Sequence, residues 1–96
     1  MPTYIVLYKF TDQGIKNVKS TLERVREAQA DSEKRGFKIT GVYWTQGQYD
    51  MVTVLEAPDE HAMVAGLLNI AGAGNVHSET MRAFPMEEMA QVLQKL

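Results

Sequence analysis

Residues 3–10 (TYIVLYKF) are rich in β-branched and aromatic side chains and precede the turn-forming residues TDQG. This pattern predicts a β-strand. The period then becomes helical, with charged residues between four apolar positions: Ile15, Val18, Leu22 and Val25. We expect one amphipathic helix here. Thr11 or Asp12 can cap its start, and Gly36 can end it because glycine tolerates a left-handed conformation.

Two further stretches with strand character, residues 37–45 and 50–57, flank a short segment that contains Gly47. Glycine accepts the positive φ of a tight loop, so this spacing predicts a β-hairpin. A second helix is predicted to begin near Pro58, which suits a first helical turn. Its buried side is predicted to consist of Ala62, Met63, Leu67 and Ile70.

The remaining chain predicts a weaker strand over residues 75–84 and a short amphipathic helix that Pro85 opens and that runs toward Leu96. The order of elements is therefore β-α-β-β-α-β with a C-terminal helix. Two split βαβ units of this kind make a ferredoxin-like sandwich, an α+β fold with helices on one face of an antiparallel sheet. We expect residues 1–96 to form a single domain of this fold.

The two strands that this topology places at the centre of the sheet are apolar on both sides. The first strand has Tyr4, Val6, Tyr8 and Phe10 on one side and Ile5 and Leu7 on the other. The third has Met51 and Leu55 on one side and Val52 and Val54 on the other. Helices can cover only one face, and the second would expose more apolar surface than a soluble monomer usually does. We therefore predict a homodimer, or a higher oligomer, formed through the sheet.

Composition narrows the classes of partner. The chain carries 10 Lys and Arg against 12 Asp and Glu, so no basic field attracts nucleic acid or an anionic membrane. The third strand also lacks the stacking aromatics of RNA-binding modules with this topology. The absence of cysteine excludes disulfides and fits a cytoplasmic location. We find no signal peptide, no run of about 18 apolar residues for a membrane span, and no cofactor-binding pattern.

Four motifs, YWTQGQYD, VLEAPD, GAGNV and TMRAF, occur in an order that resembles the GYD-domain family of small bacterial proteins. The N-terminal part fits as well, at Tyr4, Thr11, Gly14 and Lys16. The resemblance covers nearly the whole chain and implies a ferredoxin-like fold of the dimeric α/β-barrel type, without an established reaction. The residues that carry the family motif are Gly47, Tyr49 and Asp50. The chain departs from the expected family pattern at three positions: His77, Ser78 and Pro85.

The hairpin motif has two interpretations. In the structural one, Gly47 permits the loop and Asp50 accepts hydrogen bonds from loop amides. In the catalytic one, Asp50 is a general base and Tyr49 donates a hydrogen bond to a substrate oxygen. Adjacent residues of a strand point to opposite faces, so both reach one ligand only where the turn distorts the pleat.

Four other side chains are candidates for a site. Tyr43 and Trp44 are either packing residues or walls of a ligand site. On the last predicted strand, His77 is a candidate for proton transfer and Arg82 for contact with an anionic ligand. His77 and Glu79 have an H-x-E spacing, but no third ligand has a supporting position, so we predict no metal site.

Three functional hypotheses follow. The first is an oligomeric protein that binds a small hydrophobic or anionic molecule, or another protein, without catalysis. The second is an enzyme acting on a hydrophobic small molecule, such as a cyclase, an isomerase or a cofactor-free oxygenase, with Tyr49, Asp50 and His77 in proton transfer. The third is a regulatory sensor with its ligand at a subunit interface. None of the three requires a cofactor.

Overall fold

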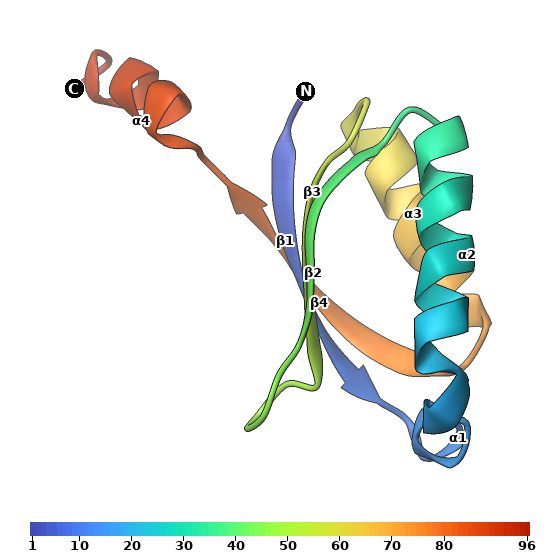
Figure 1. The fold of residues 1–96 in the computed structure, drawn as a ribbon. Helices are drawn as coiled ribbons and strands as arrows, with labels where there is room; N and C mark the ends of the chain where they lie inside the picture. Colours follow the sequence, from blue (N-terminus) through green and yellow to red (C-terminus); the bar gives the residue numbers. More distant parts are fainter.

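A computed structural model describes all 96 residues of the protein, with four strands and the helices that connect them (Figure 1). The elements in chain order are β1 (Thr3–Phe10), α1 (Asp12–Lys16), the 3₁₀ helix η1 (Val18–Ser20), α2 (Thr21–Lys34), β2 (Lys38–Trp44), β3 (Met51–Glu56), α3 (Glu60–Gly72), β4 (Val76–Ala83) and α4 (Met86–Leu93). None of the helices combines the length and the apolar character needed to cross a membrane.

The four strands form one antiparallel sheet in the order β2-β3-β1-β4. β1 and β3 therefore lie at the centre, as the sequence predicts. Helices α2 and α3 lie together on one face of the sheet, and no helix covers the other face (Figure 1). This arrangement confirms the ferredoxin-like α+β sandwich with an additional C-terminal helix.

The core lies between the sheet and the helices. Alternate residues of the two central strands supply most of it, because successive side chains of a strand point to opposite faces. The buried hydrophobic residues are Tyr4, Val6, Tyr8, Met51, Leu55, Ala57, Met63 and Val76. Val6 is the most deeply placed of the strand residues, with none of its surface exposed.

The prediction of one continuous helix after β1 is wrong. The chain forms α1, turns through η1 and only then begins α2, and the apolar stripe assigned to the helix is mostly exposed at Ile15, Val18 and Leu22. Only Val25 of that stripe packs against the core. The hydroxyl of Thr11 caps α1 by accepting a hydrogen bond from Gly14 N at 3.1 Å, as predicted.

Two contacts explain the break. Gly14 is pressed against the loop before β4, where a Cβ atom would lie 2.0 Å from the carbonyl oxygen of Asn75. This contact fixes α1 at the loop and leaves α2 to run in its own direction over the sheet. At the turn, the carbonyl oxygen of Asn17 accepts hydrogen bonds from Ser20 Oγ at 2.9 Å and Arg24 Nη1 at 2.7 Å. The amide of Ser20 donates to the same oxygen at 3.1 Å, so these groups together satisfy a carbonyl that a continuous helix would have paired four residues on.

The last two helices differ in how far they are packed. Asp59 caps α3 by accepting a hydrogen bond from Ala62 N at 2.8 Å, and the predicted side of α3 faces the core, with Met63 buried. Helix α4 projects away from the body of the molecule at the end of β4 (Figure 1). The Cα radius of gyration, 14.4 Å, exceeds the roughly 12.5 Å of a compact chain of this length.

Candidate functional site

The hairpin between β2 and β3 carries most of the residues that the sequence identifies as candidates. Gly47 has φ +104°, a left-handed conformation that glycine adopts without strain. Thr45 closes the loop: its amide donates to the carbonyl oxygen of Asp50 at 2.9 Å, and its hydroxyl donates to that of Tyr49 at 2.6 Å. The predicted hairpin is confirmed.

Asp50 joins the hairpin to the end of β1. Its carboxylate oxygen Oδ2 accepts a hydrogen bond from the amide of Phe10 at 2.8 Å, and its own amide donates to the carbonyl oxygen of Tyr8 at 2.8 Å. The carboxylate therefore satisfies a backbone amide beyond the last rung of the β1–β3 ladder. A group engaged in this way stabilises the turn, and its use as a general base stays a prediction.

Tyr49 turns toward a different partner from Asp50. Its hydroxyl donates a hydrogen bond to the carboxylate of Glu79 on β4. This hydrogen bond, with the negative charge of Glu79, raises the pKa of the Tyr49 phenol above its ordinary value. The phenol is thus held in its protonated form as a hydrogen-bond donor.

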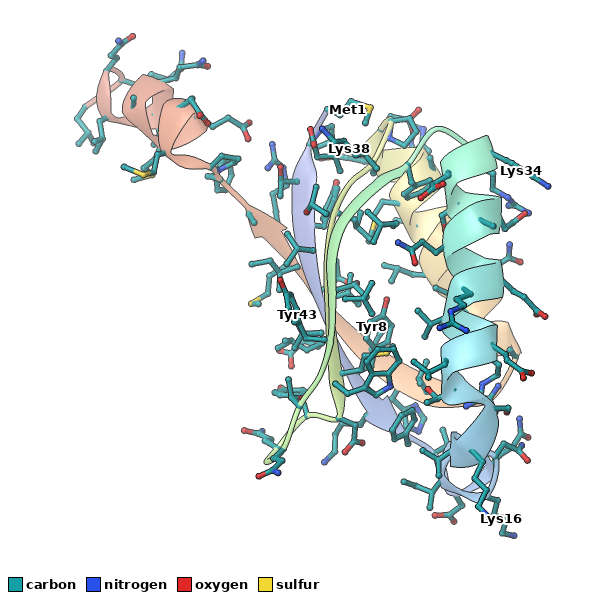
Figure 2. The ribbon with its side chains drawn as sticks, viewed as in Figure 1. Met1, Tyr8, Lys16, Lys34, Lys38 and Tyr43 are labelled. Carbon is teal, nitrogen blue, oxygen red and sulfur yellow. The ribbon has the colours of Figure 1, made fainter.

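Tyr43 and Trp44 lie on opposite sides of β2. The ring of Tyr43 lies over Gly41, where a Cβ atom would come within 2.8 Å of the ring, and 60% of the residue is exposed. The indole N–H of Trp44 donates to Thr21 Oγ1 at the start of α2, at 3.2 Å. Tyr43 thus belongs to the uncovered side of the sheet (Figure 2), while Trp44 links β2 to the helix layer.

The two candidates on β4 are also apart. His77 is paired with Lys9 and is exposed. The guanidinium of Arg82 lies over the rings of Phe84 and Tyr4, at 4.5 and 5.9 Å from their centroids, and its Nη2 is 3.1 Å from Glu88 Oε1 at the start of α4. Arg82 therefore holds α4 to the end of the sheet.

The candidates consequently do not converge on one cavity. Tyr43 and Arg82 lie on the two edge strands of the sheet, β2 and β4. Nor do three metal-ligating side chains meet anywhere in the 96 residues. On the uncovered side of the sheet, Tyr43 and His77 lie on β2 and β4, and Tyr49 reaches Glu79 of β4.

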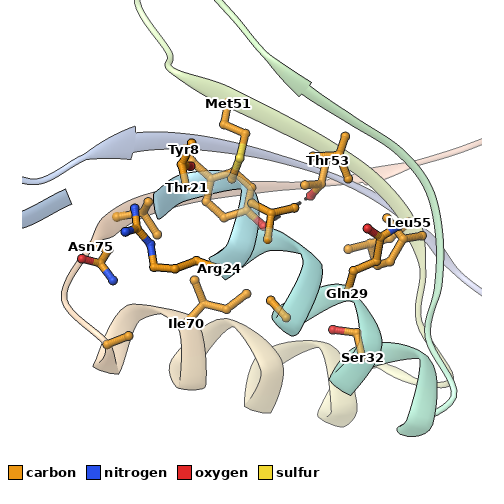
Figure 3. A pocket seen from close by; sticks show the side chains of 16 residues that line it. Tyr8, Thr21, Arg24, Gln29, Ser32, Met51, Thr53, Leu55, Ile70 and Asn75 are labelled. Atoms are coloured by element: carbon orange, nitrogen blue, oxygen red, sulfur yellow. Dashed lines mark hydrogen bonds between the residues drawn. The ribbon is translucent and has the colours of Figure 1, made fainter. Parts of the chain in front are cut away.

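A cavity that sequence reasoning missed lies on the other side of the sheet, between it and helices α2 and α3 (Figure 3). Its volume is about 210 Å³. A smaller one of about 80 Å³ adjoins it, and both are lined by Tyr8, Ala28, Ser32, Leu55 and Ile70. The sheet contributes mainly apolar side chains, such as Val42 and Met51.

The side of α2 that faces the sheet explains this cavity. Six residues at spacings of three and four line it: Thr21, Arg24, Val25, Ala28, Gln29 and Ser32. This stripe contains one large aliphatic residue, so the helix does not fill the layer between itself and the sheet. The sequence contains this stripe of α2, but the more hydrophobic set that begins at Ile15 is the one that predicts the buried side of the helix.

Two polar features border the cavity. The hydroxyls of Tyr8 and Thr53 are hydrogen-bonded at 3.3 Å, and burial raises the pKa of the Tyr8 phenol above its ordinary value. Arg24 Nη1 donates to the carbonyl oxygen of Asn17 and to Ser20 Oγ. The ion pairs of the chain involve Arg35, Lys38 and Arg82. Arg24 forms none, and no carboxylate lies within 4.0 Å of it.

The sequence of the GYD domain family matches residues 4–93. A relative from Thermus thermophilus, named glutamine synthetase and cystathionine beta-lyase binding protein, is 33% identical over 90 residues, which are 93% of this chain and 95% of the relative. The crystal structure of MtbAldR superposes with a TM-score of 0.68 at 12% identity and covers 88% of this chain. The chain spans about half of that protein, 52% of its length, so this likeness shows the fold alone.

Proposed function

Because the chain belongs to the GYD-domain family, we propose that it is a protein-binding module of a single domain. It is a homodimer formed through the uncovered sheet faces, and its partner is a metabolic enzyme of the kind that the Thermus relative is named for. The relative's name supports protein interaction in preference to catalysis. The observation that carries the proposal is the apolar face that the chain's own helices leave uncovered.

We call this surface the open face. The strand register places an apolar centre on it: Ile5, Leu7, Tyr43, Val52, Val54 and Met81. Charged residues lie at both ends, with Lys38 3.8 Å from Glu56 at one end and Lys9 and Glu79 toward the other. An apolar centre inside a polar rim is the usual anatomy of a protein interface.

Helix α4 supports self-association independently. Its apolar residues have no cover within the chain, with Met86 89% and Leu93 54% exposed. The ion pair between Arg82 and Glu88 holds its first turn, and the rest of the helix extends into solvent (Figure 2). A second copy related by a two-fold axis would cover both the open face and this helix.

The burial within one chain is also small. Only 10 of the 96 residues are buried, which is a modest core for a domain of this length. Association through the open face adds apolar burial to strands that are already ordered, so it costs little additional conformational entropy.

For the partner enzyme, the outer side of α3 is the best-placed surface. Val64 and Leu68 lie one turn apart on it and are 55% and 67% exposed. They are on the helix layer, which the proposed dimer leaves free. Exposed aliphatic residues of this kind provide a small apolar anchor for another protein.

The test is sedimentation velocity with purified glutamine synthetase and cystathionine β-lyase from the same organism as this chain. We expect the parent protein to co-sediment with one of them, and Leu68→Glu to lose that binding. Ala30→Glu on α2 is the matched control, because it places the same charge at an exposed helical position. Failure of the parent protein to bind either enzyme would contradict this choice of partner.

A second candidate is the enzyme that acts on a hydrophobic small molecule. The cavity beneath α2 favours it, since it offers an apolar compartment of about 210 Å³. Tyr49, Asp50 and His77 do not line that cavity. Turnover would therefore need other groups that line the cavity, such as the hydroxyls of Tyr8 and Thr53.

A further inference from the structure

The cavity beneath α2 is larger than the voids of ordinary protein interiors, which are close-packed and contain few gaps larger than a water molecule. Its walls are mainly apolar, so water in it gains few hydrogen bonds. It is also partly open to solvent, and Thr21 and Arg24 at the start of α2 are among its lining residues (Figure 3). A compartment of this kind favours an apolar molecule that can enter from outside.

Arg24 determines which apolar molecule fits. Arg24 and Asn75 both line the cavity, and within the chain only Nη1 of the Arg24 guanidinium has hydrogen-bond partners (Figure 3). Both partners are uncharged: the carbonyl oxygen of Asn17 and the hydroxyl of Ser20. The positive charge therefore has no counter-charge, and the two remaining nitrogens, Nε and Nη2, can donate to an anion.

We propose that this cavity binds a small monocarboxylate with an aromatic or branched aliphatic body. The carboxylate pairs with Arg24, and the body lies against Val25, Met51 and Ile70. The hydroxyl pair of Tyr8 and Thr53 forms a polar point on the sheet side, where a ligand hydroxyl or carbonyl group can be accommodated. A guanidinium prefers a carboxylate because it can form two parallel charge-assisted hydrogen bonds.

The volume limits the size of this ligand. An apolar cavity of about 150 Å³ holds benzene. The 210 Å³ observed therefore suits a six-membered ring with a side chain of a few atoms. Phenylacetate has this size and one carboxylate, and phenylacetamide is its neutral counterpart of nearly the same shape.

This inference does not depend on protein binding. The open face and the outer side of α3 contribute no residues to the cavity. A protein that binds phenylacetate but neither enzyme would retain the ligand site and lose the proposed function. A protein that binds one of the enzymes but not phenylacetate would retain the proposed function and lose the ligand site.

The experiment is isothermal titration calorimetry of the full chain with phenylacetate and, separately, with phenylacetamide. We expect phenylacetate to bind and phenylacetamide to bind at least about tenfold more weakly, because it lacks the charge that Arg24 pairs with. Equal affinities, or no heat from phenylacetate up to millimolar concentration, would overturn the proposal. This comparison uses only the parent protein and needs no variant to fold.

Two variants locate the site. Arg24→Met is expected to weaken phenylacetate binding at least about tenfold and to leave phenylacetamide binding nearly unchanged. Arg26→Met is the matched control, because Arg26 is exposed on the same helix and does not line the cavity. Ala28→Phe fills the cavity and should abolish binding of both compounds. Phenylacetate binding that survives Ala28→Phe, or that Arg26→Met weakens as much as Arg24→Met, would refute this location.

A crystal structure of the assembled protein gives an independent outcome. We expect α4 of the second copy to lie over the open face and the cavity to remain available. A cavity filled by any segment of the second copy would contradict the ligand proposal.

Discussion

The two faces of the central sheet are made from the same strands yet have different surroundings. On β1, Val6 is fully buried beneath the helices, while its neighbours Ile5 and Leu7 remain partly exposed on the open face. Both faces are apolar. Hydrophobic alternation therefore identifies the strand and its faces, whereas burial depends on what lies over each face.

The cover on the helix side is itself incomplete. Helix α2 presents Thr21, Ala28 and Ser32 to the sheet and leaves a cavity, whereas α3 presents Met63, which is 4% exposed. The open face has no cover from its own chain. The sheet therefore has three kinds of surroundings: a packed contact with α3, a cavity beneath α2, and the open face, which a second copy is proposed to bury.

Val6→Lys tests the packed face and should have the largest effect. An ammonium group placed at this fully buried position has no partner, so we expect a loss of about 4 kcal/mol or more in the free energy of unfolding. Circular dichroism of the purified variant should report a largely unfolded chain. A native-like spectrum with an unchanged melting temperature would contradict the assigned core.

Ile5→Lys places the same charge one residue earlier, on the open face. We expect the strand and helix content to persist while the particle mass falls to that of one chain, because the charge disrupts the interface and not the core. Size-exclusion chromatography with light scattering measures the mass. If Ile5→Lys unfolds the chain as completely as Val6→Lys, the two faces do not differ in the way described.

Asp50→Ala addresses the hairpin, which joins both faces. Removal of the carboxylate leaves the amide of Phe10 without its partner, so we expect a loss of about 1–3 kcal/mol in urea unfolding. Asp50→Asn keeps an acceptor oxygen and should lose less. A variant that stays as stable as the parent protein would favour the catalytic interpretation of this residue.

Tyr8→Phe has the smallest expected effect and concerns the wall of the cavity. Burial raises the pKa of Tyr8 above its ordinary value of 10.0. An unfolded chain then ionises Tyr8 at a lower pH than the folded one, so stability present below about pH 10 is lost as pH rises toward the folded pKa.

Urea midpoints at about pH 8 and about pH 10.5 measure this loss. Tyr8→Phe should lose less stability between the two values than the parent protein does. An identical pH dependence in the parent protein and Tyr8→Phe would rule out the raised pKa of Tyr8.

The sequence predicts the order of the elements, the sheet, both sides of the central strands and the family. These follow from local patterns: strand composition in residues 3–10, the glycine of the hairpin at Gly47 and the caps at Thr11 and Gly36. It does not predict the break after α1. That break depends on the approach of Gly14 to Asn75, which lie 61 positions apart in the chain.

The site is harder to predict for a similar reason. The motif residues Tyr49 and Asp50 are conspicuous in the sequence, but their partners are Glu79 and Phe10, which only the folded chain brings near. The cavity depends on small side chains that lie close together only in the folded chain, and such a set has no distinctive local pattern in the sequence. Sequence therefore identifies conspicuous residues more readily than empty space.

Sedimentation equilibrium of the unmodified protein over a wide range of concentrations tests the proposed homodimer most directly. We predict a particle of twice 10.8 kDa, or an even multiple of that chain mass, because a second copy buries the open face. A single species of 10.8 kDa that stays soluble and folded at every concentration would contradict it.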